Sequence, residues 1–213
     1  MKPTIHFIHE KFVYFNELIF NGKLPLPSFQ LTNATSFLGK YQRKELNGEL
    51  IDVITMSTSE ELKEQELEDV LIHEMIHFEI RYLGLQDTSA HGHLFMCRMT
   101  WINAVHKRNI SVSHRRGAQD EILPSRSKRG VCTVALMCFE SGEKGIKVMS
   151  CSYNSVNEFM NKVSNVSVVK SVEYYIVNDS FFDKYPRSTA LKYYRISDED
   201  IAKHLPEKAK LST

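Results

Sequence analysis

The chain has 213 residues, of which 42% are hydrophobic and 25% charged, enough for one large domain or two small ones with an apolar core. Its formal net charge is only +1, which excludes attraction to nucleic acid through overall charge and leaves only local basic clusters. No apolar run is long enough to span a bilayer, and residues 1–6 lack a signal-peptide hydrophobic region. We therefore expect a cytoplasmic protein without a membrane partner.

The four cysteines show neither a Cys-x-x-Cys pair nor the spacing of a disulfide framework. They are Cys97, Cys132, Cys138 and Cys151. We expect reduced thiols that mostly pack in the core, and no zinc ribbon. A remnant metal site formed by the last three is the weaker alternative.

The first half of the chain is predicted to begin with a helix and a small sheet. Apolar residues recur at helical spacing over residues 5–20, and Asn21-Gly22 is a typical helix end. Three short strands are predicted at residues 29–32, 37–42 and 50–56. An Asn47-Gly48 turn would join the last two strands as a hairpin. Such a sheet can offer an edge to which an extended peptide adds as a further strand.

The next predicted helix spans residues 59–83 and carries a His-Glu-x-x-His motif, formed by His73, Glu74 and His77. Ser57 or Thr58 is its expected N-terminal cap. Histidines four apart project from one helix face, near enough to hold one ion, and the glutamate can reach an ion-bound water.

The remaining residues on this helix are mostly apolar, so unpaired imidazoles and a carboxylate there would incur a desolvation cost. A metal ion removes that cost by using their lone pairs. The alternative is a pair of hydrogen-bonded core histidines. Glu74 and His77 also fit the Glu-x-x-His motif of carboxylate-bridged di-iron bundles, but the chain has no second copy of that motif. Glu79, Asp87 or backbone carbonyls are candidates to orient the imidazoles.

A second helix, predicted over residues 90–108 with Ser89 as its cap, begins with His91-Gly92-His93. On a helix these histidines point about 200° apart, so only one can join the ion. We favour His91 as the third ligand and expect His93 to be solvated or capping.

The C-terminal part is predicted to be β-rich, with a turn at residues 141–143. Strands are predicted at residues 131–139, 145–150, 168–177 and 190–196, and helices at residues 155–163 and 199–211. Several tyrosines fall in or near these strands; they are Tyr174, Tyr175, Tyr185, Tyr193 and Tyr194. Half-buried packing is their expected role, and stacking on bases is the alternative.

Residues 107–130 carry seven Lys or Arg residues against two acidic ones, a local net charge of +5. The hypothesis is sequence-independent DNA binding through phosphates, by Arg115, Arg116, Lys128 and Arg129. A solvated, flexible connector is the alternative.

Four blocks of the sequence resemble, in order and spacing, the SprT-like (Spartan-like) zinc metalloproteases. The blocks are FNELIFNGKLP from Phe15, LGKY from Leu38, HEMIH from His73 and HGHLF from His91. The resemblance covers roughly residues 5–108. After that point the chain departs from the family pattern, because many members carry a cysteine-rich zinc ribbon there and this chain lacks its Cys-x-x-Cys pairs.

The resemblance implies an α+β, zincin-like metalloprotease domain in residues 1–110. The sequence pattern after it predicts a basic linker, 111–130, and a small β-rich domain, 131–213. The resemblance also implies zinc held by His73, His77 and His91, with Glu74 as the general base. The implied reaction is peptide-bond hydrolysis, on protein substrates that include DNA-associated proteins in DNA repair. A catalytically silent module that binds nucleic acid or protein is the alternative, and the sequence does not determine the oligomeric state.

Overall fold

The computed structural model describes residues 1–46, 48–85, 87, 89–112 and 130–212. It is a mixed α+β structure whose C-terminal region is β-rich. Within the described residues the chain divides into two compact units. The first contains residues 1–90 and 108–112, and the second contains residues 91–107 and 130–212.

The first unit begins with helix α1, Ile5–Phe20, as predicted. The Thr4 hydroxyl accepts a hydrogen bond from the Phe7 N–H at 3.1 Å, which satisfies one of the free donors of the first turn. Asn21 ends the helix in the left-handed conformation, with φ 56°. The buried Asn16 side chain donates to the Leu24 carbonyl and accepts from its N–H, so the chain leaving α1 is tied back to the helix.

Three strands form the sheet of this unit, in the order β1-β3-β2. Their bounds are β1, Ser28–Thr32; β2, Gly39–Leu46; and β3, Glu49–Ser57. β1 runs parallel to the central β3 and β2 runs antiparallel to it, with Gly39 opposite Met56. The three predicted strands are confirmed, although β2 extends further toward the hairpin. The predicted turn includes Asn47, which lies outside the described residues.

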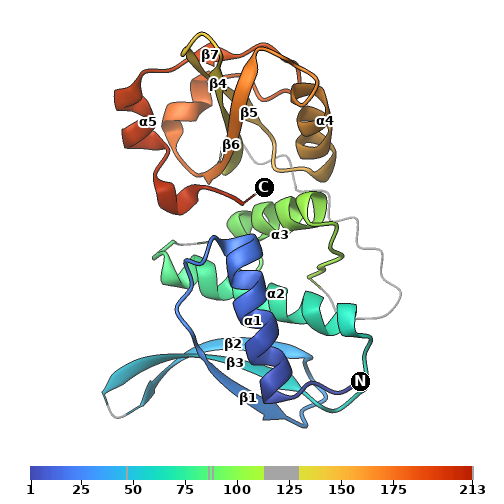
Figure 1. The fold of residues 1–213 in the computed structure, drawn as a ribbon. Coiled ribbons are helices and arrows are strands. Elements are labelled where there is room, and N and C mark those ends of the chain that lie inside the picture. The colour runs from blue at the N-terminus through green and yellow to red at the C-terminus, as the bar shows by residue number, and fades with distance from the viewer. Residues whose placement is uncertain (47, 86, 88, 113–129, 213) are drawn as a thin grey trace. The chain divides into compact units, whose positions relative to one another are not determined.

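Helix α2, Glu64–Tyr82, carries the motif histidines. Figure 1 shows α1 and α2 on the same face of the three-stranded sheet. The predicted cap at Ser57 or Thr58 is wrong, because Ser57 ends β3 and its hydroxyl donates to the Ala34 carbonyl at 2.6 Å. The helix begins instead after Lys63, whose N–H donates to the Glu66 carboxylate at 2.8 Å.

The second unit contains a four-stranded antiparallel sheet in the order β6-β4-β5-β7. The strands are β4, Cys132–Phe139; β5, Lys144–Met149; β6, Val169–Val177; and β7, Tyr194–Arg195. The last is much shorter than the predicted strand over residues 190–196. The unit's helices are α3, His93–Val105; α4, Tyr153–Val163; and α5, Asp198–His204, with short 3₁₀ helices η1, Ser180–Lys184, and η2, Glu207–Ala209.

Strand β4 is buried on both faces over its first six residues, and its sequence is apolar except for Thr133 rather than alternating. Val134 and Leu136 pack with Phe182 of η1 and with Leu205, which follows α5. Ala135, on the opposite face, is paired with Tyr174 of β6.

The chain's single tryptophan, Trp101, covers this second face of the sheet from α3. Its ring lies 4.7 Å from the ring of Tyr174, centroid to centroid. The indole N–H donates to the Ser212 carbonyl at 3.1 Å, and the Leu211 N–H donates to the Tyr174 carbonyl. The tyrosines predicted as packing residues are buried or half-buried, which confirms that expectation for Tyr174 and Tyr175.

The expectation of four reduced cysteines is wrong for two of them. Cys97 of α3 and Cys151, which follows β5, form a disulfide with their Cα atoms 5.0 Å apart. They lie 54 residues apart in sequence, so the pairing depends on how α3 packs within the second unit and not on local spacing. Cys132 and Cys138 are free thiols.

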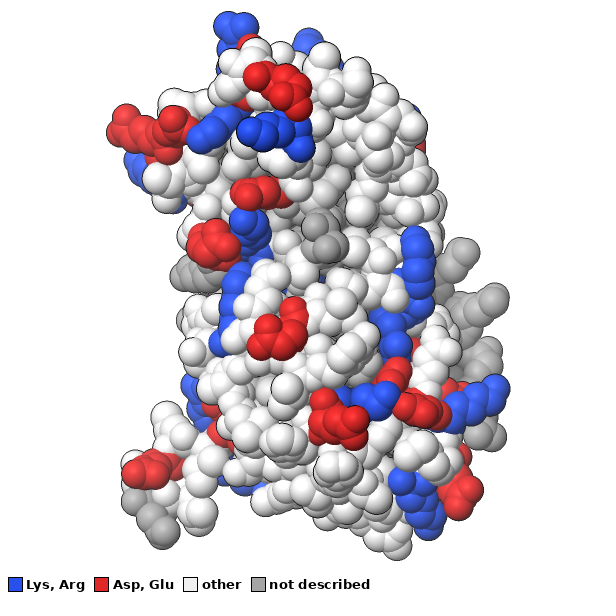
Figure 2. All heavy atoms as spheres, in the orientation of Figure 1, with Lys and Arg blue, Asp and Glu red and all other residues white. Residues whose placement is uncertain are grey.

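Charged side chains of opposite sign are interspersed on the face drawn in Figure 2, as the small net charge leads one to expect. Among the described residues, no helix combines the length and apolar character needed to cross a membrane.

Candidate metal centre

His73 lies in the middle of α2 and is only 3% exposed. Its Nδ1 atom is 3.0 Å from the backbone carbonyl oxygen of Ser111. A carbonyl can only accept a hydrogen bond, so Nδ1 must carry the proton and the lone pair of the neutral ring is on Nε2. This is the tautomer required of a histidine that binds a metal through Nε2.

His77 lies one helical turn further on, and its Nε2 atom is 3.2 Å from Nε2 of His73. Two nitrogen ligands of a tetrahedral zinc ion are about 3.3 Å apart, given zinc–nitrogen bonds of about 2.0–2.1 Å. The spacing between these two atoms therefore already suits a shared ion.

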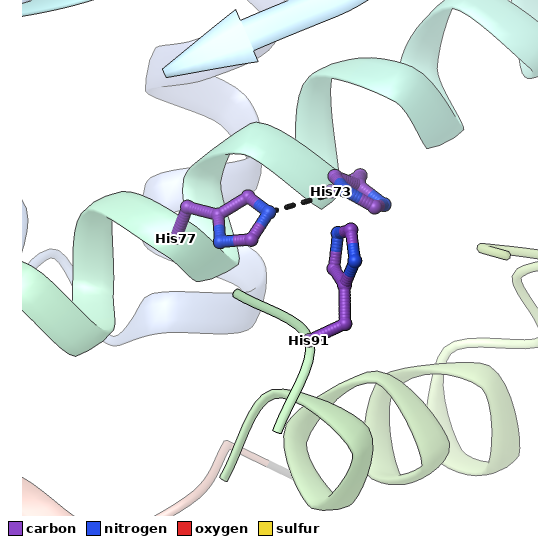
Figure 3. A group of neighbouring side chains, drawn as sticks. All are labelled: His73, His77 and His91. Atoms are coloured by element: carbon purple, nitrogen blue, oxygen red, sulfur yellow. Dashed lines mark hydrogen bonds between the residues drawn. The ribbon is translucent and has the colours of Figure 1, made fainter. Parts of the chain in front are cut away.

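His91 does not lie in α3 as predicted, but in a turn before it. The predicted helix start is wrong because Gly92, with an extended backbone, is the N-cap. The ring of His91 packs edge-on against Phe95, with centroids 4.7 Å apart. Figure 3 shows the imidazole directed toward His73 and His77.

The three histidines form a group that could hold a metal ion, with one ligand atom from each within 4.8 Å of the others. Three imidazoles are a donor set found in catalytic zinc sites, where the fourth position is left for water. His93 is not in this group. Nor is any carboxylate, so the group does not favour the di-iron alternative. Within the described part of the chain, Cys132, Cys138 and Cys151 form no such group.

Glu74 follows the first of these histidines and is 4% exposed. Its Oε2 atom accepts a hydrogen bond from the Tyr41 N–H of β2 at 2.8 Å. Burial raises the pKa of the Glu74 carboxyl to about 7, and the Tyr41 hydrogen bond limits the rise. The strand that holds the carboxylate, β2, is an edge strand of the first sheet.

The sequence analysis assigned no role to three participants in this arrangement, which are Gly39, Tyr41 and Ser111, although the LGKY block contains the first two. A Cβ atom on Gly39 would lie 2.8 Å from Oε1 of Glu74, so only glycine permits this approach of β2 to α2. Tyr41 and Ser111 act through backbone groups, which nearly every residue type supplies, so their side chains gave no signal of these roles. Backbone carbonyls were among the groups predicted to orient the imidazoles, and that of Ser111 contacts His73.

The basic residues predicted to contact DNA are Arg115, Arg116, Lys128 and Arg129. All four lie outside the described residues.

Comparison with known proteins gives one family. The model of the SprT-like family matches residues 8–115, which include all three histidines and Glu74. No curated protein and no solved structure matches the chain significantly.

Proposed function

The chain belongs to the SprT-like family, and from this premise we propose that it is a zinc-dependent peptidase. The observation that carries the proposal is the position of the buried Glu74 carboxylate. It lies on the same helix as two of the three clustered histidines and accepts a hydrogen bond from the Tyr41 N–H of β2. A buried acid beside three imidazoles is the residue set of metal-assisted peptide hydrolysis.

His73, His77 and His91 would hold the zinc as neutral imidazoles. Bound zinc would supply a Lewis acid that lowers the pKa of water and polarises a peptide carbonyl. Ser111 contributes by accepting from Nδ1 of His73, which directs the lone pair of Nε2 toward the other histidines.

Glu74 would act as the general base. Its carboxylate takes a proton from the attacking water and later delivers it to the amine that leaves. The hydrogen bond from Tyr41 restrains Oε2, so the carboxylate is oriented before substrate arrives. β2 is an edge strand, and a substrate that pairs with this edge would lie next to the carboxylate.

The test compares the wild type with Glu74→Gln, which preserves the shape of the side chain but removes the base. We expect Glu74→Gln to keep one zinc per chain and to lose hydrolysis of protein substrates and of itself. Glu66→Gln is the matched control, because Glu66 is an exposed glutamate of the same helix. Zinc bound by a wild type that hydrolyses nothing would favour the catalytically silent binding module, and loss of zinc from Glu74→Gln would contradict the assigned roles.

We also propose that the substrates include proteins bound to DNA. The support is the +5 charge of residues 107–130, of which Arg108 is already paired with Glu68 and Asp69. In this proposal a basic linker, 111–130, connects a protease domain, 1–110, to the β-rich domain, 131–213. A cytoplasmic location is likewise a proposal, and the Cys97–Cys151 disulfide counts against it, because disulfides are rare in that compartment.

The DNA proposal is tested with a variant in which Arg115, Arg116, Lys128 and Arg129 are all alanine. Wild-type affinity for DNA should fall steeply with salt, and the variant should bind all sequences more weakly with a smaller salt slope. Salt-dependent binding that survives in the variant would contradict these residues' role, whatever the result with Glu74→Gln.

A further inference from the structure

Arg108 fastens a short segment of chain to α2 just before His73. Its Nε atom donates to Oδ1 of Asp69 at 2.7 Å, and its Nη2 atom donates to Oε2 of Glu68 at 2.9 Å. Nη2 also reaches the Gln65 carbonyl at 3.3 Å. The side chains of Arg108, Glu68 and Asp69 are only 12–14% exposed, so these charged contacts are little screened by solvent.

The residues after Arg108 continue the attachment. The Asn109 backbone N–H also donates to the Asp69 carboxylate, and Ile110 is 4% exposed. The carbonyl of Ser111, the next residue, accepts from Nδ1 of His73. Asp69 and His73 are four residues apart on α2, hence on one helix face, and residues 108–111 follow that face for one turn.

We propose that Arg108 is a positioning residue for the metal centre. By tying residues 108–111 to Glu68 and Asp69, it holds the Ser111 carbonyl against Nδ1 of His73. The proton then stays on Nδ1, and the lone pair of Nε2 is available to a metal ion. The part of this inference that concerns zinc rests on the proposed function, whereas the part that concerns the His73 tautomer does not.

Lys11 provides a matched control within the same charge network. Its Nζ atom contacts Oε1 of Glu68 and Oε1 of Glu64, each at 2.6 Å, from α1. Lys11→Met and Arg108→Gln each remove one cation from Glu68. Only the second releases the segment that carries Ser111, so a difference between the variants reports on that segment and not on lost charge.

The first measurement is zinc affinity, by competition with a chromophoric chelator. We expect Arg108→Gln to bind zinc about 10- to 100-fold more weakly than the wild type, the range typical of lost outer-shell contacts to a ligand histidine. Lys11→Met should bind within about twofold of the wild type, although it too loses an ion pair. Equal zinc affinity in wild type and Arg108→Gln would overturn the inference.

The second measurement is the tautomer of His73, read from imidazole ¹⁵N chemical shifts after zinc is removed with a chelator. The wild type and Lys11→Met should show a protonated Nδ1, and Arg108→Gln should show a mixture of tautomers. A single, unchanged tautomer in Arg108→Gln would contradict the positioning role. If the wild type binds no zinc but the His73 tautomer still changes as expected in Arg108→Gln, the proposed function is refuted and the role of Arg108 stands.

If Arg108→Gln does not fold, Arg108→Lys replaces it in both measurements. Lysine keeps the charge but cannot contact Glu68, Asp69 and the Gln65 carbonyl with the same planar fork. We expect a smaller loss of zinc affinity, about three- to tenfold on the scale of lost outer-shell contacts. Wild-type affinity and tautomer in Arg108→Lys would then overturn the inference.

Discussion

Gly39 and Glu74 approach each other so closely that a methyl group on Gly39 would lie 2.8 Å from Oε1 and 2.9 Å from Cγ of the glutamate. The same methyl group would lie 2.7 Å from Cγ1 of Val70. The backbone of β2 therefore touches α2 at the residue proposed as the catalytic base. Two residues along the strand, the Tyr41 N–H binds the same carboxylate.

Gly39→Ala should displace either β2 or the Glu74 side chain. We expect hydrolysis to fall at least about tenfold, because a displaced general base loses its alignment, while zinc content stays at the wild-type level. The overpacking should also lower the free energy of unfolding by about 1–3 kcal/mol. Gly130→Ala is the control, since a Cβ atom there has no neighbour within 4 Å. Wild-type hydrolysis by Gly39→Ala would show that the structure accommodates the added methyl group without displacing the Glu74 carboxylate.

His91→Ala and His93→Ala should differ in metal binding. The ligand atom of His91 lies within 4.8 Å of those of His73 and His77, whereas His93 is not part of the group. Removal of one of three protein ligands should weaken zinc binding at least about 100-fold in His91→Ala, and His93→Ala should retain its zinc. Metal analysis after gel filtration measures both, and the reverse pattern would transfer the third ligand to His93.

The disulfide between Cys97 and Cys151 is open to direct chemical measurement. The denatured, unreduced chain should show two reactive thiols, from Cys132 and Cys138, and four after reduction. Replacing both bonded cysteines by serine should lower the free energy of unfolding of the second unit by about 2–4 kcal/mol. Cys138→Ser serves as the control. Four reactive thiols before reduction would restore the expectation drawn from the sequence.

Acid should weaken the first sheet through the ion pair of Asp52. Burial by itself would raise the pKa of the Asp52 carboxyl, but hydrogen bonds from Arg43 and Tyr41 outweigh it and hold the pKa below its usual value. A carboxyl whose pKa is lowered by folding stabilises the fold above its unfolded pKa, about 3.8, and loses that contribution as the pH falls through the folded value. The Nε and Nη2 atoms of Arg43 donate to Oδ1 and Oδ2 of Asp52 at 2.8 Å and 2.9 Å.

Arg43→Gln should accordingly cost about 1 kcal/mol of unfolding free energy at pH 7, the upper range for a partly exposed pair. The difference from the wild type should shrink as the pH drops below about 4. Urea titrations of both proteins between pH 3 and 7 measure it. If the difference in unfolding free energy is constant across this range, Arg43 does not lower the pKa of Asp52.

Features set by neighbouring residues were predictable from the sequence. The spacing of apolar residues and the Asn21-Gly22 end define α1, and the His-Glu-x-x-His motif identifies two histidines of the site and Glu74. The start of α2 was not predictable, because Ser57, a good cap by residue type, is engaged by the Ala34 carbonyl from another part of the chain.

Features that depend on residues distant in sequence could not be predicted. The disulfide joins residues 54 apart, and the contact between His73 and Ser111 uses a carbonyl group that every residue has. His91 was identified, but its place in a turn was not, since Gly92 interrupts the helical pattern there only through its backbone conformation.

Trp101 gives the protein an internal optical reporter. It is the only tryptophan in the chain, it is 1% exposed, and its partners Tyr174 and Ser212 belong, like Trp101 itself, to the second unit. Fluorescence excited at the red edge of the indole band should therefore follow the unfolding of that unit alone, whereas far-ultraviolet circular dichroism follows both units together. Where the two signals diverge along a denaturant titration, the cooperativity between the units can be read without any label.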